Sequence, residues 1–421
     1  MSCPKLHPPP RAPVGGGTLP SFGKKVSNRE NPLHAALTAR PSELKLAHSD
    51  AGRSILPRRN PVSVLHINTE RGWRGGERQV LWLAAHLDRT GHRCVIAARP
   101  DQPLATRALD AGLRVEECSP MWEYDPLAAR RLRALISHER IEIVHAHTAH
   151  AASLALISTP TDIPIVITRR VDFPVKRNWV SRLKYRRAAA IIAVSDAVAR
   201  VLVDGGMDPE RVEVIRSGVD LGRNVVPIER AALTQFGIPA DAPLVVMVAA
   251  LEPHKDPLTF VRAMRTTLSS VPGAHALLVG EGPLRADVER ETATLGLGDR
   301  LHLAGFRSDA DSIMAAADVV ALSSQMEGLG TVLIDALSLG KPIAATRTGG
   351  IPELVEDGES GLLAPPRDPP ALGWAIARLL TDAGLASRVS SAGREKAAEM
   401  SVERTAARTA LVYERVTAAA G

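Results

Sequence analysis

The sequence has few cysteines and few aromatic residues. Its 421 residues include 3 cysteines, at positions 3, 94 and 118, and none of them forms a C-x-x-C pair. This spacing predicts neither a disulfide framework nor a zinc site, and it fits a reducing cytoplasm. Aromatic residues make up 3% of the chain, which argues against base stacking, so we expect no nucleic-acid partner.

Long apolar runs are also lacking. No run approaches the ~18 apolar residues of a membrane-spanning helix, and the N-terminus has no apolar segment of the signal-peptide type. We therefore expect a cytoplasmic protein, which would do any work at a membrane peripherally, on its inner face.

The positive charge is concentrated at the N-terminus. The net charge is +6, and residues 1–60 hold ten Lys or Arg against three acidic residues, so the rest of the chain is nearly neutral. Residues 1–60 are also rich in Pro, Gly and Ser and show no hydrophobic period. They predict a disordered basic tail, which we interpret as solvated rather than functional.

Apolar segments of strand length alternate with helical patterns from residue 61 onward. We expect strands at 62–67, 94–98, 141–145, 163–168, 191–194 and 212–215, and a second series at 244–249, 274–279, 301–303, 319–322 and 343–345. Strands separated by helices indicate βαβ units and parallel sheets.

Two such series predict an α/β protein of two domains. The expected domains are residues 61–221 and 243–400, joined by a linker at 222–242 and followed by a last helix within 401–421. The carboxyl ends of their strands would face each other across a cleft.

The segment from Glu327 to Asp335 follows one of these strands and has a carboxylate at each end, with glycines between. We expect it to open a helix that reaches about residue 339, with the two acids on one face, two turns apart. The free amides of a helix N-terminus bind anions. Acids at both ends of an anion site suit a sugar nucleotide, which has hydroxyls at both ends and negative charge between.

Other strand ends carry weaker signals. Gly75 and Gly76 lie in the turn after the first strand, where glycine allows either close approach to a phosphate or a plain turn. Lys255 follows the strand at 244–249 and is a natural partner for a diphosphate. Gly305 and Phe306 follow the strand at 301–303 and suit the border of a base.

Three histidines, His145, His147 and His150, cluster after the strand at 141–145. Imidazole suits zinc, but no carboxylate or cysteine shares the two-residue spacing that puts His145 and His147 on one face of a strand, so we expect no metal. We interpret His147 as a residue that lines the cleft and hydrogen-bonds a sugar hydroxyl, and the others as packed.

A basic segment spans residues 169–187, with eight Lys or Arg interleaved with apolar residues and a single acid, Asp172. This pattern predicts contact with an anionic membrane surface or a phosphorylated acceptor. A solvated helix face is an equally good interpretation.

An ordered series of motifs runs through residues 62–416. It reads Gly-Gly-Glu-Arg, Val-Ser-Asp-Ala-Val, Ile-Arg-Ser-Gly-Val-Asp, Leu-Glu-Pro-His-Lys-Asp, Val-Gly-Glu-Gly-Pro, Ala-Gly-Phe, Ala-Asp-Val, Ser-Ser-Gln-Met-Glu-Gly-Leu-Gly and Thr-Gly-Gly-Ile-Pro-Glu-Leu. The series resembles that of the group 1, or family 4, retaining glycosyltransferases.

The resemblance implies a GT-B fold, in which two Rossmann-like domains hold the acceptor and the nucleotide sugar, respectively. It also implies metal-independent transfer with retention at the anomeric carbon and without a cofactor. The expected partners are a nucleotide sugar, by default a UDP-sugar, and a saccharide or lipid-linked acceptor of bacterial cell-envelope or polysaccharide synthesis.

The resemblance also assigns roles to single residues. Lys255 would neutralise the donor diphosphate, Glu327 would lie beside the donor sugar, and Asp335 would bind the ribose hydroxyls. Together with His147, Lys255 and Glu327 are the expected catalytic residues. The remaining donor contacts would come from Gly75, Gly76, Gly305, Phe306, Gly328, Leu329, Gly330 and Thr331.

The chain departs from the family pattern at three places. The family usually has Glu where Asp335 stands, Arg where Ala250 stands, and often His where this chain has Arg169-Arg170. Our hypothesis is that Arg170 or Arg216 supplies the missing diphosphate cation. The departures keep two alternatives open, a GT-B-like nucleotide-sugar epimerase and a non-catalytic sugar-nucleotide sensor.

Overall fold

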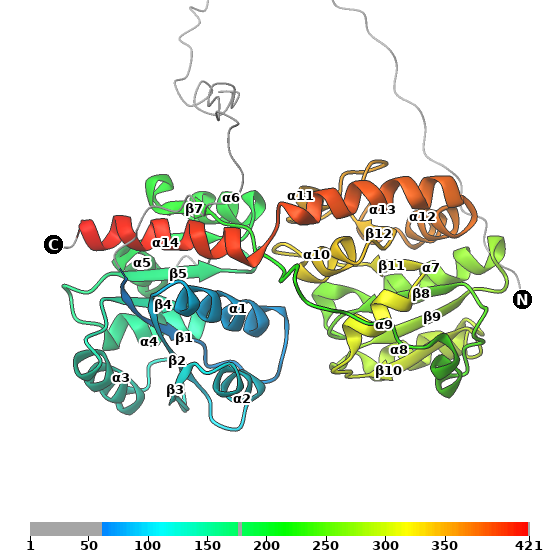
Figure 1. The fold of residues 1–421 in the computed structure, drawn as a ribbon. Helices are drawn as coiled ribbons and strands as arrows, with labels where there is room; N and C mark the ends of the chain where they lie inside the picture. The colour runs from blue at the N-terminus through cyan, green and yellow to red at the C-terminus, as the bar shows by residue number, and fades with distance from the viewer. Residues whose placement is uncertain (1–60, 176–178, 420–421) are drawn as a thin grey trace, which may run out of the picture. The chain divides into compact units, whose positions relative to one another are not determined.

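A computed structural model describes residues 61–175 and 179–419, so the tail expected over residues 1–60 lies outside the described residues. Two parallel sheets carry helices between successive strands (Figure 1). We call the parts built on them the N-terminal lobe and the C-terminal lobe. This architecture confirms the predicted α/β class with two Rossmann-like units.

The N-terminal lobe contains a seven-stranded sheet in the order β3-β2-β1-β4-β5-β6-β7. Its strands are β1 (Ser63–Ile67), β2 (Arg93–Ala98), β3 (Arg114–Glu117), β4 (Ile143–Ala146), β5 (Ile165–Arg169), β6 (Ala188–Ala193) and β7 (Val212–Val214). Its helices are α1 (Gly75–Arg89), α2 (Pro103–Asp110), α3 (Pro126–His138), α4 (Ala149–Ser158), α5 (Trp179–Arg187) and α6 (Asp196–Asp204), followed by the 3-10 turn η1 (Pro209–Arg211).

Helices cover both faces of this sheet, which explains why its central strands are apolar throughout. Val64 and Ile143 pack in one core with α1 and α2, while Leu65 and Val144 pack in the other with α3 and α4. Strand β3 was not expected from the sequence, because it is a partly exposed edge strand with charged residues and no apolar run.

The C-terminal lobe contains a six-stranded sheet in the order β10-β9-β8-β11-β12-β13. Its strands are β8 (Leu244–Val248), β9 (His275–Val279), β10 (Leu301–Gly305), β11 (Val319–Leu322), β12 (Ile343–Thr346) and β13 (Leu362–Ala364). Its helices are η2 (Arg230–Phe236), η3 (Pro253–Lys255), α7 (Pro257–Ser270), α8 (Arg285–Thr294), α9 (Ala310–Ala316), α10 (Thr331–Ser338), α11 (Ile351–Leu354), α12 (Pro369–Thr381) and α13 (Ala383–Ala398).

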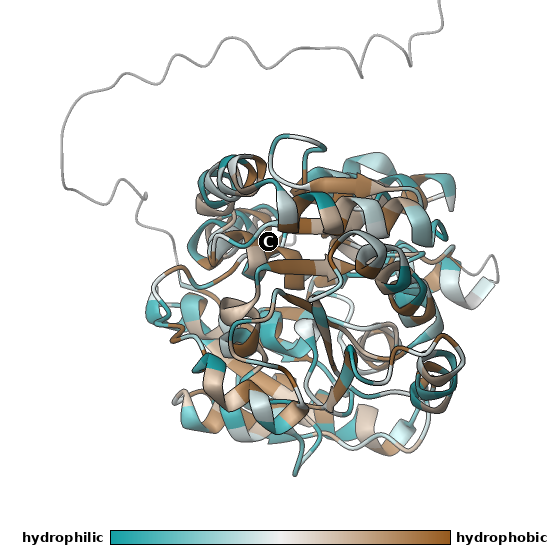
Figure 2. Ribbon diagram, turned by 90° about the vertical axis from the view of Figure 1, so that its right-hand side faces the viewer, coloured by the Kyte–Doolittle hydropathy of each residue, from teal (hydrophilic) through white to brown (hydrophobic). Residues whose placement is uncertain are grey.

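The last helix, α14 (Val402–Ala418), packs on the N-terminal lobe. Ser401 caps it by accepting a hydrogen bond from the Arg404 amide, and Tyr413 is fully buried in the core beside α1. Figure 2 shows the apolar strands in the interior, with the polar residues mostly on the helices. Among the described residues, no helix combines the length and apolar character that a membrane crossing needs.

Both sheets reverse their strand order at one point. In the N-terminal lobe β1 lies between β2 and β4, and in the C-terminal lobe β8 lies between β9 and β11. The loops that leave neighbouring strands at such a point run to opposite sides of the sheet and leave a crevice at the strands' carboxyl ends. The fold therefore predicts ligand contacts from the loops after β1, β4, β8 and β11.

Candidate functional site

A cavity of about 1550 Å³ lies at these strand ends, lined by residues of both lobes. Most of the residues predicted from the sequence line it: Gly75, Gly76, His147, Arg170, Lys255, Phe306, Glu327, Leu329, Gly330, Thr331 and Asp335. Gly305, Gly328 and Arg216 are not among the residues that line it.

The loop after β11 carries Glu327, and helix α10 begins only at Thr331. The expectation of one helix from Glu327 to Asp335 is therefore wrong. Gly330 adopts a φ of +87°, which no helix accommodates and which glycine tolerates. Glu327 stands in the loop and accepts hydrogen bonds from Lys255 Nζ and, at 3.2 Å, from Ser324 Oγ.

Backbone packing fixes this loop. The Gly350 amide donates to the Glu327 carbonyl at 2.9 Å, and a Cβ at Gly349 would overlap that carbonyl. Ser195 Oγ donates to the Gly328 carbonyl at 2.6 Å, and a Cβ at Gly328 would overlap the Arg170 carbonyl. The glycines here serve close backbone contact, so Gly328 supports the site from behind the cavity wall.

Two helix N-termini meet at the cavity. Gly75 begins α1, and a Cβ at this position would overlap Oγ1 of Thr331, which begins α10. Each N-terminus presents free amides and the positive end of a helix dipole. The juxtaposition is a site for an anion, with Lys255 in the same lining.

Arg170 adds a cation that is not neutralised. Within the described part of the chain its guanidinium makes only long hydrogen bonds, at 3.4 Å to Ser217 Oγ and 3.4 Å to His147 Nδ1. Its enclosed Nε has no hydrogen-bond partner among the described residues. Burial lowers the pKa of Arg170 to about 10, against a through-space contribution from Glu77, so the side chain is charged at neutral pH.

Arg216 has a different environment. It donates to Glu353 Oε2 at 2.7 Å and also to Asp196. Two carboxylates thus neutralise Arg216 away from the cavity lining. Of the two arginines in our hypothesis, Arg170 alone lines the cavity.

Asp335 is buried in an ionic network that sequence reasoning missed. It accepts hydrogen bonds from Arg78, on α1, and from Arg223 at 2.7 Å, and both arginines also bond Asp311. Asp311 and Asp335 raise the pKa of Arg78 although burial acts to lower it. The sequence feature that could have revealed this network is Arg78, which ends the Gly-Gly-Glu-Arg motif and to which we had assigned no role.

Phe306, which we expected to border a base, is open to solvent. It is 59% exposed at the cavity edge. Gly305 adopts a φ of +68°, and a Cβ there would press on Glu281. This edge offers an exposed aromatic face next to a position that favours glycine.

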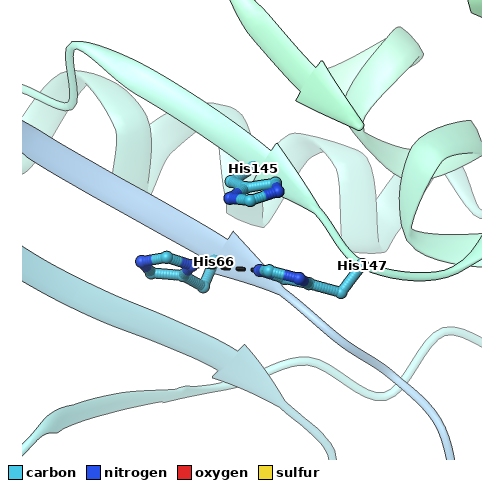
Figure 3. Close-up of side chains that lie close together, drawn as sticks. All are labelled: His66, His145 and His147. Carbon is cyan, nitrogen blue, oxygen red and sulfur yellow. Dashed lines mark hydrogen bonds between the residues drawn. The ribbon is translucent and has the colours of Figure 1, made fainter. Parts of the chain in front are cut away.

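Three imidazoles lie together at the cavity wall, which His147 lines (Figure 3). His66 and His145 are register partners on β1 and β4, and His147 follows β4. His66 Nδ1 and His147 Nε2 are 3.0 Å apart, while the ring centroids of His145 and His147 are 4.0 Å apart. His66 was not predicted; the only signal was one polar residue inside a buried strand.

Burial keeps the three imidazoles neutral. It lowers the pKa of His66 to about 3 and holds the pKa values of His145 and His147 well below 6.5, with neighbouring His and Arg170 adding to the shift of His147. His145 hydrogen-bonds Tyr413 Oη through Nδ1 and Thr168 Oγ1 through Nε2, both at 2.6 Å.

The three imidazoles resemble a zinc ligand set, because one nitrogen of each lies within 4.8 Å of the others. A cation fits them poorly. The permanent charge of Arg170 stands 3.4 Å from His147, and both nitrogens of His145 are already hydrogen-bonded. No carboxylate or thiolate joins the group in the described part of the chain.

The basic segment 169–187 directs several of its charges inward. Arg169 donates to Tyr185 Oη at 2.8 Å, Lys184 to the Ala149 carbonyl at 3.2 Å, and Arg187 to the Pro160 carbonyl at 2.6 Å. Residues 176 and 177 lie outside the described residues. Trp179 and Leu183 are exposed at 75% and 47%.

Comparison with known proteins agrees with this geometry. Residues 229–396 match the family described as Glycosyl transferases group 1, and residues 73–223 match the family described as Glycosyltransferase Family 4. Together the two matches cover most of both lobes.

Curated relatives come from several pathways. The chain is 30% identical over 229 residues to the lipopolysaccharide core biosynthesis glycosyltransferase LpsE of Rhizobium meliloti, covering 54% of this chain and 63% of LpsE. It is 28% identical over 418 residues to a D-inositol 3-phosphate glycosyltransferase of Mycolicibacterium paratuberculosis, covering 88% of this chain and 93% of the relative.

Among solved structures, Anabaena HepE in complex with UDP and glucose has a TM-score of 0.74 at 22% identity, covering 84% of this chain and 100% of HepE. Sucrose-phosphate synthase of Thermosynechococcus elongatus has a TM-score of 0.71 at 20% identity, covering 85% and 100%. These likenesses establish the two-lobed fold. With its two lobes and its ordered motifs matched in turn, the chain belongs to the group 1 (family 4) glycosyltransferases of the GT-B fold.

Proposed function

We propose that the protein transfers a sugar from a UDP-sugar to an acceptor hydroxyl, with retention at the anomeric carbon. The observation that carries the proposal is Arg170, a charged side chain without an acidic hydrogen-bond partner beside the facing N-termini of α1 and α10. Lys255 lines the same cavity. The complex of HepE with UDP supports uridine as the base.

In the proposed reaction the bond between the anomeric carbon and the diphosphate oxygen breaks. The acceptor oxygen bonds to the anomeric carbon on the same face, and its proton passes to the departing phosphate oxygen. Lys255, Arg170 and the helix amides stabilise the charge that develops on the diphosphate. These groups can replace a divalent cation, so the proposed transfer needs no metal, and it uses no cofactor.

Donor binding would rearrange existing ion pairs. The diphosphate competes with Glu327 for Lys255, and the ribose hydroxyls compete with Arg78 for Asp335. Asp335 keeps Arg223 as a partner when Arg78 moves. Asp335, whose side chain is shorter than the Glu usual in the family, would therefore bind both the ribose and a cation.

The acceptor we propose is a saccharide or lipid-linked saccharide with negative charge. Besides Arg170, four arginines that have no ion-pair partner among the described residues line the N-terminal-lobe side of the cavity: Arg71, Arg99, Arg107 and Arg169. The name of LpsE, a lipopolysaccharide core biosynthesis glycosyltransferase, supports a role in bacterial cell-envelope synthesis. In the cytoplasm, Trp179 and Leu183 would offer a peripheral contact with an anionic membrane surface.

The test is donor turnover with UDP- and GDP-sugars in the presence of EDTA, measured as released nucleotide. We expect release from a UDP-sugar, and a drop in kcat of about 10²–10³-fold in Lys255→Ala and Arg170→Gln. Lys396→Ala, in a surface pair with Glu356, is the matched control and keeps the wild-type rate.

Two results would contradict the proposal. Interconversion of UDP-sugars without released nucleotide indicates an epimerase, and binding without turnover across a wide acceptor panel indicates a sensor. Co-sedimentation with anionic liposomes at low salt tests the membrane contact separately, and its absence would exclude that contact.

A further inference from the structure

His147 is held on three sides by protein groups. Its Nδ1 faces Arg170 at 3.4 Å, its Nε2 faces His66 Nδ1 at 3.0 Å, and the ring of His145 packs on its face at 4.0 Å between centroids. His147 and Arg170 line the cavity, whereas His66 and His145 lie behind it. Figure 3 shows His66 directed at His147 from the neighbouring strand.

The hydrogen bonds determine where the protons are. A guanidinium only donates, so Nδ1 of His147 must accept from Arg170 and carries the lone pair. Neutral His147 then carries its proton on Nε2 and donates it to His66 Nδ1. His66 in turn carries its proton on Nε2, an atom without a hydrogen-bond partner among the described residues.

This arrangement has a cost that points to function. An enclosed N–H without a partner destabilises the fold, because it has lost its hydrogen bond to water and gained none in return. An apolar residue at position 66 would avoid that cost and would match its neighbours Leu65 and Ile67, which are both buried. In return, Nδ1 of His66 supplies a hydrogen-bond acceptor beside Nε2 of His147.

We propose that His66 is a positioning residue, which fixes His147 in the Nε2–H tautomer so that the Nδ1 lone pair serves the reacting sugar. When the diphosphate draws Arg170 away, Nδ1 becomes free to accept a hydrogen bond from a sugar hydroxyl. In the other tautomer Nδ1 would carry a proton and could not accept. The inference rests on the proposed function and adds a residue to its site.

The neighbouring contacts keep the ring in place for this role. The Tyr413 hydroxyl and Thr168 Oγ1 engage both nitrogens of His145, which packs on His147. His145 therefore has no free nitrogen with which to bond His147, and of the described residues it is His66 and Arg170 that determine the tautomer of His147.

The first experiment reads the tautomer directly in the full-length protein labelled with ¹⁵N at its 13 histidines. Two-bond ¹H–¹⁵N correlations distinguish the two neutral tautomers, and His147→Asn identifies the signal. Because Arg170 also holds Nδ1 as an acceptor, the comparison is repeated in an Arg170→Leu background, where His66 acts without it. We expect a single Nε2–H tautomer in the wild type and in Arg170→Leu, a mixture when His66→Leu is added to Arg170→Leu, and the single tautomer again with His66→Asn, since Asn Oδ1 can occupy the place of Nδ1.

The second experiment measures steady-state kinetics with the UDP-sugar that the wild type turns over. We expect kcat to fall about tenfold in His66→Leu, as for the loss of one productive hydrogen bond. The KM for the donor should stay within about twofold. His66→Asn should recover most of kcat, which a role in packing alone does not predict.

The C-terminal lobe provides a matched control. Arg300, His275 and His302 form the same kind of chain, with contacts of 2.9 Å and 3.1 Å, away from the cavity lining. His302→Leu removes the residue that corresponds to His66 and should leave kcat unchanged.

Three results would overturn the inference. They are an Nδ1–H tautomer of His147 in the wild type, a tautomer unaffected when His66→Leu is added to Arg170→Leu, and equal loss of kcat in His66→Leu and His66→Asn. If the wild type turns over no donor, the proposed function fails, while the tautomer measurement still decides the role of His66.

Discussion

At the scale of the residue, the arginines of the cavity occupy two kinds of environment, which differ in whether carboxylates neutralise their charge. Among the described residues Arg170 hydrogen-bonds only neutral partners, Ser217 and His147, and keeps its full charge for a ligand. Arg78 and Arg223 instead converge on Asp335, whose side chain is 2% exposed. The first arrangement favours anion binding, and the second favours stability of the fold.

This difference predicts the effect of Asp335→Ala. The substitution leaves two largely buried guanidiniums with Asp311 as their remaining carboxylate, and breaking a buried pair in this way costs about 3–5 kcal/mol. Urea unfolding followed by circular dichroism measures the change in the free energy of unfolding. Glu289→Ala is the control, because its pair with Arg285 is exposed and should contribute less than about 1 kcal/mol. If the two substitutions lower the free energy of unfolding by the same amount, the ionic network around Asp335 stabilises the fold no more than an exposed ion pair does.

At the scale of the element, the loop between β11 and α10 depends on glycine contacts in its own lobe. Gly349 stands against the Glu327 carbonyl, and the Gly350 amide donates to the same oxygen. The loop carries Glu327 and leads into the N-terminus of α10, so its position determines where the donor sugar and diphosphate would bind.

Gly349→Ala should therefore displace this loop. We expect the affinity for UDP, measured by calorimetry, to fall at least about tenfold, because the added Cβ has to move a backbone carbonyl. Gly358→Ala is a matched control: both glycines have positive φ, +51° and +80°, but a Cβ at Gly358 meets nothing within 4 Å. The same loss of affinity in both variants would show that backbone strain, not the contact with Glu327, is responsible.

At the scale of the whole molecule, the buried histidines link folding to pH. His66 titrates at about 3 in the folded protein and near 6.5 when unfolded. Between these values the unfolded chain binds a proton that the folded chain does not, so the stability contributed by neutral His66 is present above about pH 6.5 and is lost as the pH falls. His145 and His147 shift in the same direction.

The free energy of unfolding should thus decrease from pH 7 to pH 5. A histidine whose pKa falls from 6.5 to about 3 on folding, as that of His66 does, contributes about 2 kcal/mol to that decrease. His66→Asn removes one such group, so its urea unfolding curves at the two pH values should differ by about 2 kcal/mol less than those of the wild type. An unchanged difference would show that His66 is not kept neutral by folding.

Local sequence properties determined much of the fold and part of the site. Apolar runs of strand length that alternate with helical patterns specify parallel sheets, because each buried strand must be covered on both faces. Lys255 and the glycines near Glu327 were found from their positions at strand ends, since the ends of parallel strands meet at one edge. The start of α10 was misplaced because the pattern did not show that Gly330 adopts a left-handed conformation.

Tertiary structure alone decided which side chains meet. His66 and His147 are 81 residues apart in the chain, Arg223 and Asp335 are 112 apart, and Arg78 and Asp335 are 257 apart. A sequence pattern reports the burial and direction of a side chain within its own element, but its partner depends on strand order and on the approach of the two lobes. For that reason the sequence by itself determined the family, the lobes and the importance of the loop that carries Glu327, and only the folded chain revealed the Arg78–Asp335 pair and the contact between His66 and His147.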